Sequence, residues 1–371
     1  MSSFLLLALL LGLSAASINF TTVFEWNTFD FVWPSEDFGK EALRKGDYVP
    51  TKIFPEDHVV YGERVFISIF NSSKHPTPAT LTWLRSTSNS RSPKLNPYPS
   101  WRMHEKGNCM TIQEIKGMVV DARGHLWAVD NGNEICPAKL WIFDLTENDS
   151  LSLVHQFTND TVAHTFRDRD LNSLVLDKRP NDTLAYIPDY VSGNLIVFSL
   201  NENASWAVQI KDISNVSCIA LSPKLIYLGF SINTALYSVP LSELRTKGQK
   251  APLAPTLVGN KKAGSFKMLM DNKGKLYFDL KNLSYIGIWD TTAPFKEEEL
   301  YKENQEMAVL PSEPTASSYA IQREQLDEEM YDDVAPPVTT TSVQIELGSA
   351  SNVYEEVYPL PPGSELYLCL H

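Results

Sequence analysis

The chain has 371 residues, of which 43% are hydrophobic and 21% charged, and its formal net charge is −13 at pH 7. Ten of these negative charges belong to residues 311–371, which hold eleven acidic residues and a single basic one, Arg323. The rest of the chain is nearly balanced and has no large basic patch, which argues against a nucleic-acid-binding protein.

The N-terminal segment has the pattern of a secretory signal peptide. Phe4–Leu13 is an apolar run, and the small residues Ser14–Ser17 follow it. We predict a signal peptide over residues 1–16, cleaved near Ala16. Because this run is too short to span a bilayer and no later run is long enough, we expect a secreted, extracellular protein without a membrane span.

Asn-X-Ser/Thr sequons support secretion, since most of them fall in polar stretches between apolar runs, where a glycan can face solvent. Besides Asn19, the predicted glycosylation sites are Asn71, Asn148, Asn159, Asn181, Asn203, Asn215 and Asn282.

An aromatic, alternating stretch, Phe24–Pro34, predicts an edge strand or a strand that closes a sheet. Val65–Phe70 and Thr80–Arg85 then predict a degenerate first repeat. Ser86–Ser100 is rich in Ser, Asn, Arg and Pro and predicts an exposed loop.

Four clearer repeats run from there to about Pro294. In each, an apolar run ends at an anchor residue, a turn follows, and two further apolar strands complete the unit. The anchors Asp121, Asp177, Ser222 and Asp271 lie 56, 45 and 49 positions apart. This period, with short strands and no sustained helical pattern, predicts an all-β fold, a β-propeller with blades of four strands.

The propeller domain is expected over residues 17–310. At roughly 45–50 residues per blade this length would give about six blades, yet only five apolar units are found. Either the two chain ends together build the sixth blade or that blade is missing. We expect some closure of the ring, because an open ring exposes an unpaired strand edge.

The composition changes at Pro311. Residues 311–371 are acidic, rich in Pro, Ser and Thr and poor in large aliphatic residues, which predicts a disordered tail. Tyr331 and Tyr354 lie among acids, so the tail is either a sulfated segment or a solvated spacer.

Four cysteines are few for this length, so the core must stabilise the fold. Cys109 and Cys136 bracket one strand–turn–strand unit, and we predict a disulfide between them. Cys218 lies in an apolar run and is expected to be a buried thiol. Cys369, near the C-terminus, is expected to be exposed, which leaves intermolecular pairing open.

Six motifs follow one another over most of residues 24–295: FEWNTFDFVWP (Phe24–Pro34), YPSW (Tyr98–Trp101), MVVDARGHLWAVDNG (Met118–Gly132), CPAKLWIFDL (Cys136–Leu145), LAYIPDYVSGNLIVFSL (Leu184–Leu200) and YIGIWDTTAPF (Tyr285–Phe295). With these motifs the chain resembles the yellow / major royal jelly protein family. It implies a secreted insect protein with a six-bladed propeller. The last blade would be divergent or incomplete, since the family's final Leu-Trp-Val-Leu-Ser-Asn strand has no counterpart after Pro311.

The resemblance implies several functions: cuticle pigmentation and eggshell roles, dopachrome conversion in the melanin route, nutrition as royal jelly, and binding of biogenic amines. It also identifies two departures from the family pattern. Arg123 stands where the family usually has a cysteine, and the segment Lys178–Thr183 lacks the cysteine that the family tends to have there, as expected if one disulfide has been lost.

The second strands of three repeats end in an acidic residue, and propellers bind ligands where inner strands converge at the mouth of the channel. There, a carboxylate can pair with an ammonium group and an aromatic ring can stack on a catechol or indole. The predicted site for a small aromatic amine or catechol consists of Asp130, Asn131, Asp189, Tyr190, Phe278 and Asp279. The alternative is that each repeated Asp caps a turn.

Common catalytic motifs are absent: the sequence has no Gly-X-Ser-X-Gly, phosphate-binding Gly-rich loop, His-Glu-X-X-His or Cys-X-X-Cys. The seven histidines are scattered without ligand spacing, so we predict neither a metal site nor a cofactor. Dopachrome tautomerisation would need only a proton donor and acceptor, so catalytic residues stay unassigned. The leading hypothesis is a binding protein of the extracellular matrix, cuticle or eggshell, with a dopachrome isomerase and a purely structural protein as alternatives.

Overall fold

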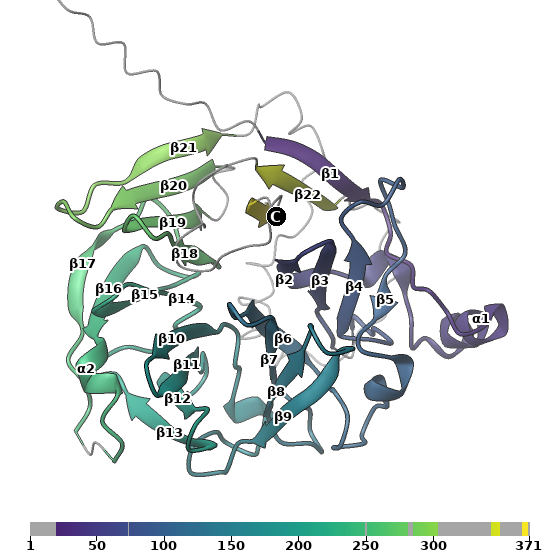
Figure 1. Ribbon diagram of the computed structural model, residues 1–371, viewed down its shortest axis with the longest axis horizontal. Helices are drawn as coiled ribbons and strands as arrows, with labels where there is room; N and C mark the ends of the chain where they lie inside the picture. Colours follow the sequence, from purple (N-terminus) through teal and green to yellow (C-terminus); the bar gives the residue numbers. More distant parts are fainter. Residues whose placement is uncertain are drawn as a thin grey trace, which may run out of the picture.

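The computed structural model describes residues 20–72, 74–248, 251–280, 285–302, 343–348 and 366–369. Within these residues, five four-stranded antiparallel sheets follow one another around a ring (Figure 1). In each sheet the strands follow chain order and the first strand lies nearest the centre. The fold is therefore an all-β propeller, as the repeats predict.

The five sheets are numbered as blades in chain order. Blade 1 consists of β2 (Pro55–Tyr61), β3 (Arg64–Ile69), β4 (Leu81–Arg85) and β5 (Asn96–Pro97). Blade 2 consists of β6 (Ile115–Val120), β7 (His125–Asp130), β8 (Lys139–Asp144) and β9 (Ser150–Gln156). Blade 3 consists of β10 (Val175–Arg179), β11 (Asp182–Pro188), β12 (Asn194–Ser199) and β13 (Ala204–Gln209). Blade 4 consists of β14 (Cys218–Leu221), β15 (Leu225–Gly229), β16 (Ala235–Pro240) and β17 (Thr256–Asn260). Blade 5 consists of β18 (Met268–Met270), β19 (Lys275–Leu280), β20 (Tyr285–Asp290) and β21 (Glu298–Lys302).

A three-stranded sheet closes the ring between blade 5 and blade 1 (Figure 1). Its strands are β1 (Phe20–Trp26), β22 (Val343–Gly348) and β23 (Leu366–Cys369). β1 pairs antiparallel with β22, β22 pairs with β23, and β23 contacts β2. The described residues thus build five four-stranded blades, not the six implied by the resemblance, because no apolar four-strand unit follows β21. Strands from both chain ends occupy the remaining position.

β22 and β23 also lie inside residues 311–371, where the composition predicts a disordered tail. The local signal for β22 is alternation, since Val343, Ile345 and Leu347 stand at every second position. The rest of the tail, including Tyr331 and Tyr354, lies outside the described residues.

The aromatic stretch after β1 packs on blade 1. Phe24, Trp26, Phe29 and Phe31 are at most 2% exposed and belong to one apolar cluster with the side chains of β3. The stretch therefore contributes a closing strand only as far as Trp26, and its remainder covers the first blade. The other apolar clusters each join two neighbouring blades.

Helices are few in the described residues. α1 (Glu36–Lys45) begins after Ser35, whose hydroxyl accepts a hydrogen bond from Phe38 N, and ends at Gly46, whose φ is 75°. The other helical segments are α2 (Leu241–Leu244) and the 3-10 turns η1 (Pro50–Lys52), η2 (Trp101–His104) and η3 (Phe166–Asp168). In the part of the chain that the structure describes, no helix has the length and apolar character needed to cross a membrane.

The predicted signal peptide, together with Asn19 and Asn282, lies outside the described residues. Four of the predicted glycosylation sites are exposed: Asn148, Asn159, Asn181 and Asn203. Asn71 and Asn215 are half-buried, and Asn215 Nδ2 donates a hydrogen bond to the carbonyl oxygen of Tyr190 (3.4 Å).

Candidate functional site

The predicted acids lie together at one end of the channel. In an antiparallel blade, the end of the second strand lies beside the start of the first. Asp130, which ends β7, is paired with Ile115, which begins β6. Asp189 forms an isolated bridge with Leu171, just before β10. The acids at the repeated sequence position therefore occupy equivalent places in their blades, beside the start of the first strand.

Asp130 is fully buried, and hydrogen bonds from its own blade occupy both carboxylate oxygens. It accepts from the backbone N–H groups of Gln113 (3.1 Å), Glu114 (2.8 Å) and Gly132 (2.9 Å) and from Trp141 Nε1 (2.9 Å). The carboxylate therefore fixes the backbone that leads into β6.

Asp189 and Asp279 make the same contact in their own blades. Asp189 Oδ1 accepts from the backbone N–H of Asp170 (2.8 Å), and Asp279 Oδ1 accepts from that of Lys267 (2.7 Å). Burial raises the pKa of Asp279 to about 6, against the opposing effect of its backbone hydrogen bonds and Lys267. Each acid thus holds a charged residue that precedes the first strand.

The other three predicted residues have different surroundings. Asn131 is buried, and its Nδ2 donates to Glu114 Oε2 (3.2 Å). Tyr190 is half-buried, and its backbone N–H donates to the carbonyl oxygen of Asp170 (2.8 Å). Phe278 is 1% exposed and belongs to the apolar cluster between blades 4 and 5.

A group of charged side chains comes from the inner strands and from the segments that lead into them. We call Glu56, Glu114, Lys116 and Asp170 the channel cluster. Lys116 Nζ lies 2.9 Å from Glu56 Oε1, 3.4 Å from Glu114 Oε1 and 3.9 Å from Asp170 Oδ1. The cluster therefore brings together three carboxyl groups and one amine from three blades, and Lys116 is only 3% exposed.

A second ion pair extends this polar ring to blade 5. Lys267 Nζ lies 2.7 Å from Asp57 Oδ1 and 3.4 Å from His58 Nδ1. The other oxygen of Asp57 accepts from the backbone N–H of Met118 (2.8 Å). Asp57 thus connects the first and last blades with blade 2.

Burial dominates the electrostatics of the channel cluster. It raises the pKa of Glu56 to about 7, with Lys116 opposing the shift and Glu114 and Asp170 adding to it. Burial also raises the pKa of Glu114. For Lys116 burial disfavours the charged amine, but the carboxylates of Glu114, Glu56 and Asp170 outweigh it and raise the pKa.

Glu56 retains unused hydrogen-bonding capacity. Its Oε2 is buried and has no hydrogen-bond partner among the described residues. The ring of Phe70 lies beside the cluster, with its centroid 4.8 Å from Lys116 Nζ. A buried acceptor and an aromatic ring are thus close to one another at the channel.

The four residues of the channel cluster were not among the site residues predicted from the sequence. A usable signal was present in the run Glu114–Val120, where polar residues stand directly before and inside the apolar strand. Polar side chains at the start of an inner strand face the channel end rather than the blade interfaces. No group of three or more His, Cys, Asp or Glu in the described residues has a metal-binding arrangement.

A disulfide braces the same end of blade 2. Cys109 and Cys136 are joined at an S–S distance of 2.06 Å, with their Cα atoms 5.1 Å apart. The bond links the segment before β6 to the loop after β7, and Lys139 Nζ donates to the carbonyl oxygen of Cys109 (2.9 Å). Cys218 is a buried free thiol.

The chain is similar to several known proteins. Residues 115–222 and 214–331 match the family model "Major royal jelly protein". "Protein yellow" of Drosophila guanche is 33% identical over 205 residues, and that of Drosophila madeirensis 32% identical over 205 residues; each match covers 52% of this chain. The matched region spans only 35% of the length of these relatives. Virginiamycin B lyase from Staphylococcus aureus, a solved structure, shares 13% identity over 67% of this chain and 69% of its own, with a TM-score of 0.42.

Proposed function

The chain belongs to the major royal jelly protein family, and we propose that it is a secreted, yellow-like protein that binds a small aromatic amine or catechol at the channel cluster. The matched relatives are about three times as long as the matched region, so their activities enter here only as hypotheses.

The buried, unpaired Oε2 of Glu56 supports this proposal most directly. A buried carboxylate oxygen without a donor is costly, and a protonated amine would supply both the donor and the compensating charge. The cluster has three carboxyl groups around one lysine, so a second cation is electrostatically favoured there. Phe70 offers an aromatic ring against which a catechol or indole would pack.

The six residues predicted from the sequence act mainly as supports in this proposal. Asp130 and Asn131 orient Glu114, Asp189 and Tyr190 hold the backbone of Asp170, and Asp279 holds that of Lys267. Phe278 belongs to the apolar cluster between blades 4 and 5. We expect substitutions at these positions to weaken ligand binding through the geometry of the channel cluster.

We propose an extracellular setting, in matrix, cuticle or eggshell. The predicted signal peptide, the disulfide and the exposed sequons support this location. Pigmentation follows as a role only if the ligand is a catechol of the melanin route.

Isothermal titration of the secreted protein with dopamine and serotonin tests the binding proposal. We expect Glu56→Gln to weaken binding about tenfold, which corresponds to about 1.4 kcal/mol. The matched control is Glu63→Gln, a side chain on the β2–β3 turn at the other end of the same blade, 66% exposed and paired with Arg85 (3.4 Å). Equal amine affinities for the two variants would show that the channel cluster is not the binding site.

Dopachrome isomerisation is a second candidate, favoured by the pKa of Glu56. A carboxyl group that titrates near 7 can both accept and donate a proton at neutral pH. An isomerase would decolourise dopachrome at a rate proportional to protein and saturable with substrate, and Glu56→Gln would lose this activity. Binding without loss of dopachrome absorbance would identify a carrier. If the protein neither binds the ligands nor lowers dopachrome absorbance, a structural role is left.

A further inference from the structure

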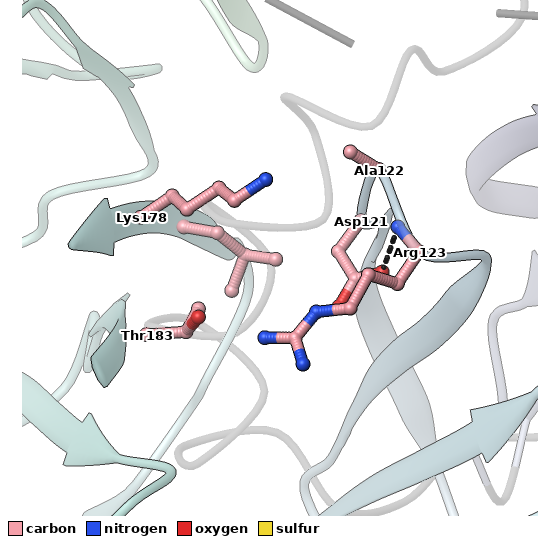
Figure 2. A pocket seen from close by; sticks show the side chains of 6 residues that line it. Asp121, Ala122, Arg123, Lys178 and Thr183 are labelled. Carbon is pink, nitrogen blue, oxygen red and sulfur yellow. Dashed lines mark hydrogen bonds between the residues drawn. The ribbon is translucent and has the colours of Figure 1, made fainter. Parts of the chain in front are cut away.

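A second cluster of charged residues lies between blades 2 and 3, at the end of the channel opposite the channel cluster. The β6–β7 turn of one blade faces the β10–β11 turn of the next. Together they enclose a crevice of about 10 Å³, the space of roughly one water molecule. Figure 2 shows it, and its lining residues are Asp121, Ala122, Arg123, Leu176, Lys178 and Thr183.

Two cations from neighbouring blades face this crevice. The side chains of Arg123 and Lys178 extend into the space between the two turns, with Thr183 beside them (Figure 2). Both cations are exposed, and neither side chain is ion-paired or hydrogen-bonded to any described residue. Two like charges held across a narrow gap repel one another, and an anion between them would reverse that effect.

The acid in the crevice wall does not neutralise these cations by direct contact. Asp121 accepts hydrogen bonds from the backbone N–H groups of Arg123 (2.8 Å) and His125 (3.0 Å). Its second oxygen lies 3.0 Å from His125 Nδ1 and accepts from Trp127 Nε1 (3.2 Å). Both oxygens are therefore engaged in the blade 2 turn, and the guanidinium and ammonium groups remain available.

We propose that this crevice binds a small oxyanion, the sulfate or phosphate group of a larger molecule, through Arg123, Lys178 and Thr183. A guanidinium group offers two parallel N–H donors to an oxyanion, an ammonium adds a point charge, and a hydroxyl adds a third donor. The enclosed space holds roughly one water molecule, so the oxyanion sits at the mouth of the crevice, between the two cations. This site is separate from the channel cluster and does not depend on the proposed amine binding.

Other turns at this end of the channel carry further exposed lysines. Lys224, between β14 and β15, and Lys273, between β18 and β19, are exposed and form no ion pair with described residues. They extend the attractive field for a polyanion without lining the crevice. Because Lys224 and Lys273 do not line the crevice, substituting them tests for general attraction of anions, and they serve as control positions for Arg123 and Lys178.

The first test is titration of the full chain with sodium sulfate and sodium phosphate at constant ionic strength. We expect saturable binding that Arg123→Ala and Lys178→Ala each weaken at least tenfold, while Lys224→Ala and Lys273→Ala change it less than twofold. Arg123→Lys should retain part of the affinity. Unchanged thermal unfolding midpoints would show that all variants remain folded. Absence of saturable binding, or equal losses in the crevice and control variants, would overturn the proposal.

The second test distinguishes the sources of the oxyanion with dextran sulfate, polyphosphate and polyglutamate. Selective loss of dextran sulfate binding in Arg123→Ala assigns the site to sulfate esters, and selective loss of polyphosphate binding assigns it to phosphate. Polyglutamate binding should fall by the same factor in crevice and control variants. If all three polymers respond alike, only total charge is sensed and the crevice is not a site.

Discussion

Asp130 shows how a single buried carboxylate can organise a channel end without touching a ligand. Four donors point at it, three of them backbone N–H groups. Lys139 Nζ lies 3.9 Å away and is itself buried. Removing the carboxylate would leave these donors without an acceptor in a region closed to water, which is far costlier than losing one surface hydrogen bond.

We therefore expect Asp130→Ala to lower the free energy of unfolding by about 3–5 kcal/mol. Urea unfolding followed by tryptophan fluorescence measures this change. Asp160→Ala, on an exposed loop, is the control and should stay within about 0.5 kcal/mol of wild type. Equal stability of the two variants would contradict the structural role of Asp130.

Glu56 provides a prediction about pH. Its pKa in the folded protein is about 7, so the carboxylate needed to pair with an ammonium ligand forms only as the pH rises through neutrality. We expect amine affinity to increase about tenfold between pH 6 and pH 8. Titrations with dopamine at these two pH values measure the change.

Glu56→Gln should remove this pH dependence, since the amide does not titrate. An affinity that rises equally in the variant would assign the effect to another group. An affinity that falls with pH in wild type would contradict the assignment of Glu56 as the ammonium acceptor.

At the residue scale, the repeated acids could be read from the sequence, whereas the side chains of the channel cluster could not. An Asp at or next to the end of the second strand recurs in blades 2, 3 and 5, so Asp130, Asp189 and Asp279 could be found without a structure. Glu56 and Lys116 are sixty positions apart and meet only because two inner strands are neighbours in the ring. No local pattern contains that contact.

At the scale of elements, the turns of blades 2 and 3 explain a departure from the family pattern. The family's usual cysteines correspond to Arg123 and to the segment Lys178–Thr183. The structure places Arg123, Lys178 and Thr183 around one crevice. The two departures are therefore neighbours in space, as expected if one cross-link between blades has been lost.

Restoring that cross-link is a direct test. We expect Arg123→Cys combined with Lys178→Cys or with Thr183→Cys to form a disulfide, detected by mass spectrometry under non-reducing conditions. Closing a loop of this length should stabilise the chain by at most about 4 kcal/mol, seen in thermal unfolding with and without reductant. The single cysteine variants are the controls. If neither pair forms a bond, the two turns are too far apart for this explanation.

The closing sheet gives a second prediction at this scale. Ile345 is the central residue of a ladder, with Phe24 opposite on β1 and Cys369 opposite on β23. Proline at this position removes a backbone donor from the middle strand, so Ile345→Pro should destabilise the closure by about 3 kcal/mol.

Thermal unfolding and light scattering measure this loss, because an unpaired β1 edge also promotes association. Ile345→Val, which keeps the backbone donor at the same position, is the matched control. Indistinguishable behaviour of the two variants would show that β22 does not close the ring in solution.

At the scale of the whole molecule, the sequence predicted the β-propeller but left its number of blades and its closure open. Five apolar units were found where the length and the resemblance implied six blades, and the described residues build five four-stranded blades, each of which buries its faces against its neighbours. The closing strands could not be located from the sequence, because β22 and β23 are short and stand in an acidic, Pro-rich context that overall composition identifies as disordered. Whether two chain ends meet depends on the geometry of the closed ring.

The pairing of β1 with β22 has a consequence for the time course of synthesis. Phe20 pairs with Gly348, so about 330 further residues must be synthesised before β1 can pair with β22. At roughly 5–20 residues per second this takes about 15–65 s. During that interval the five blades can form only an open arc, with one exposed edge at its beginning. β22 and β23 therefore complete the closing sheet only late in synthesis, and the nascent chain is most in need of chaperone protection before they emerge.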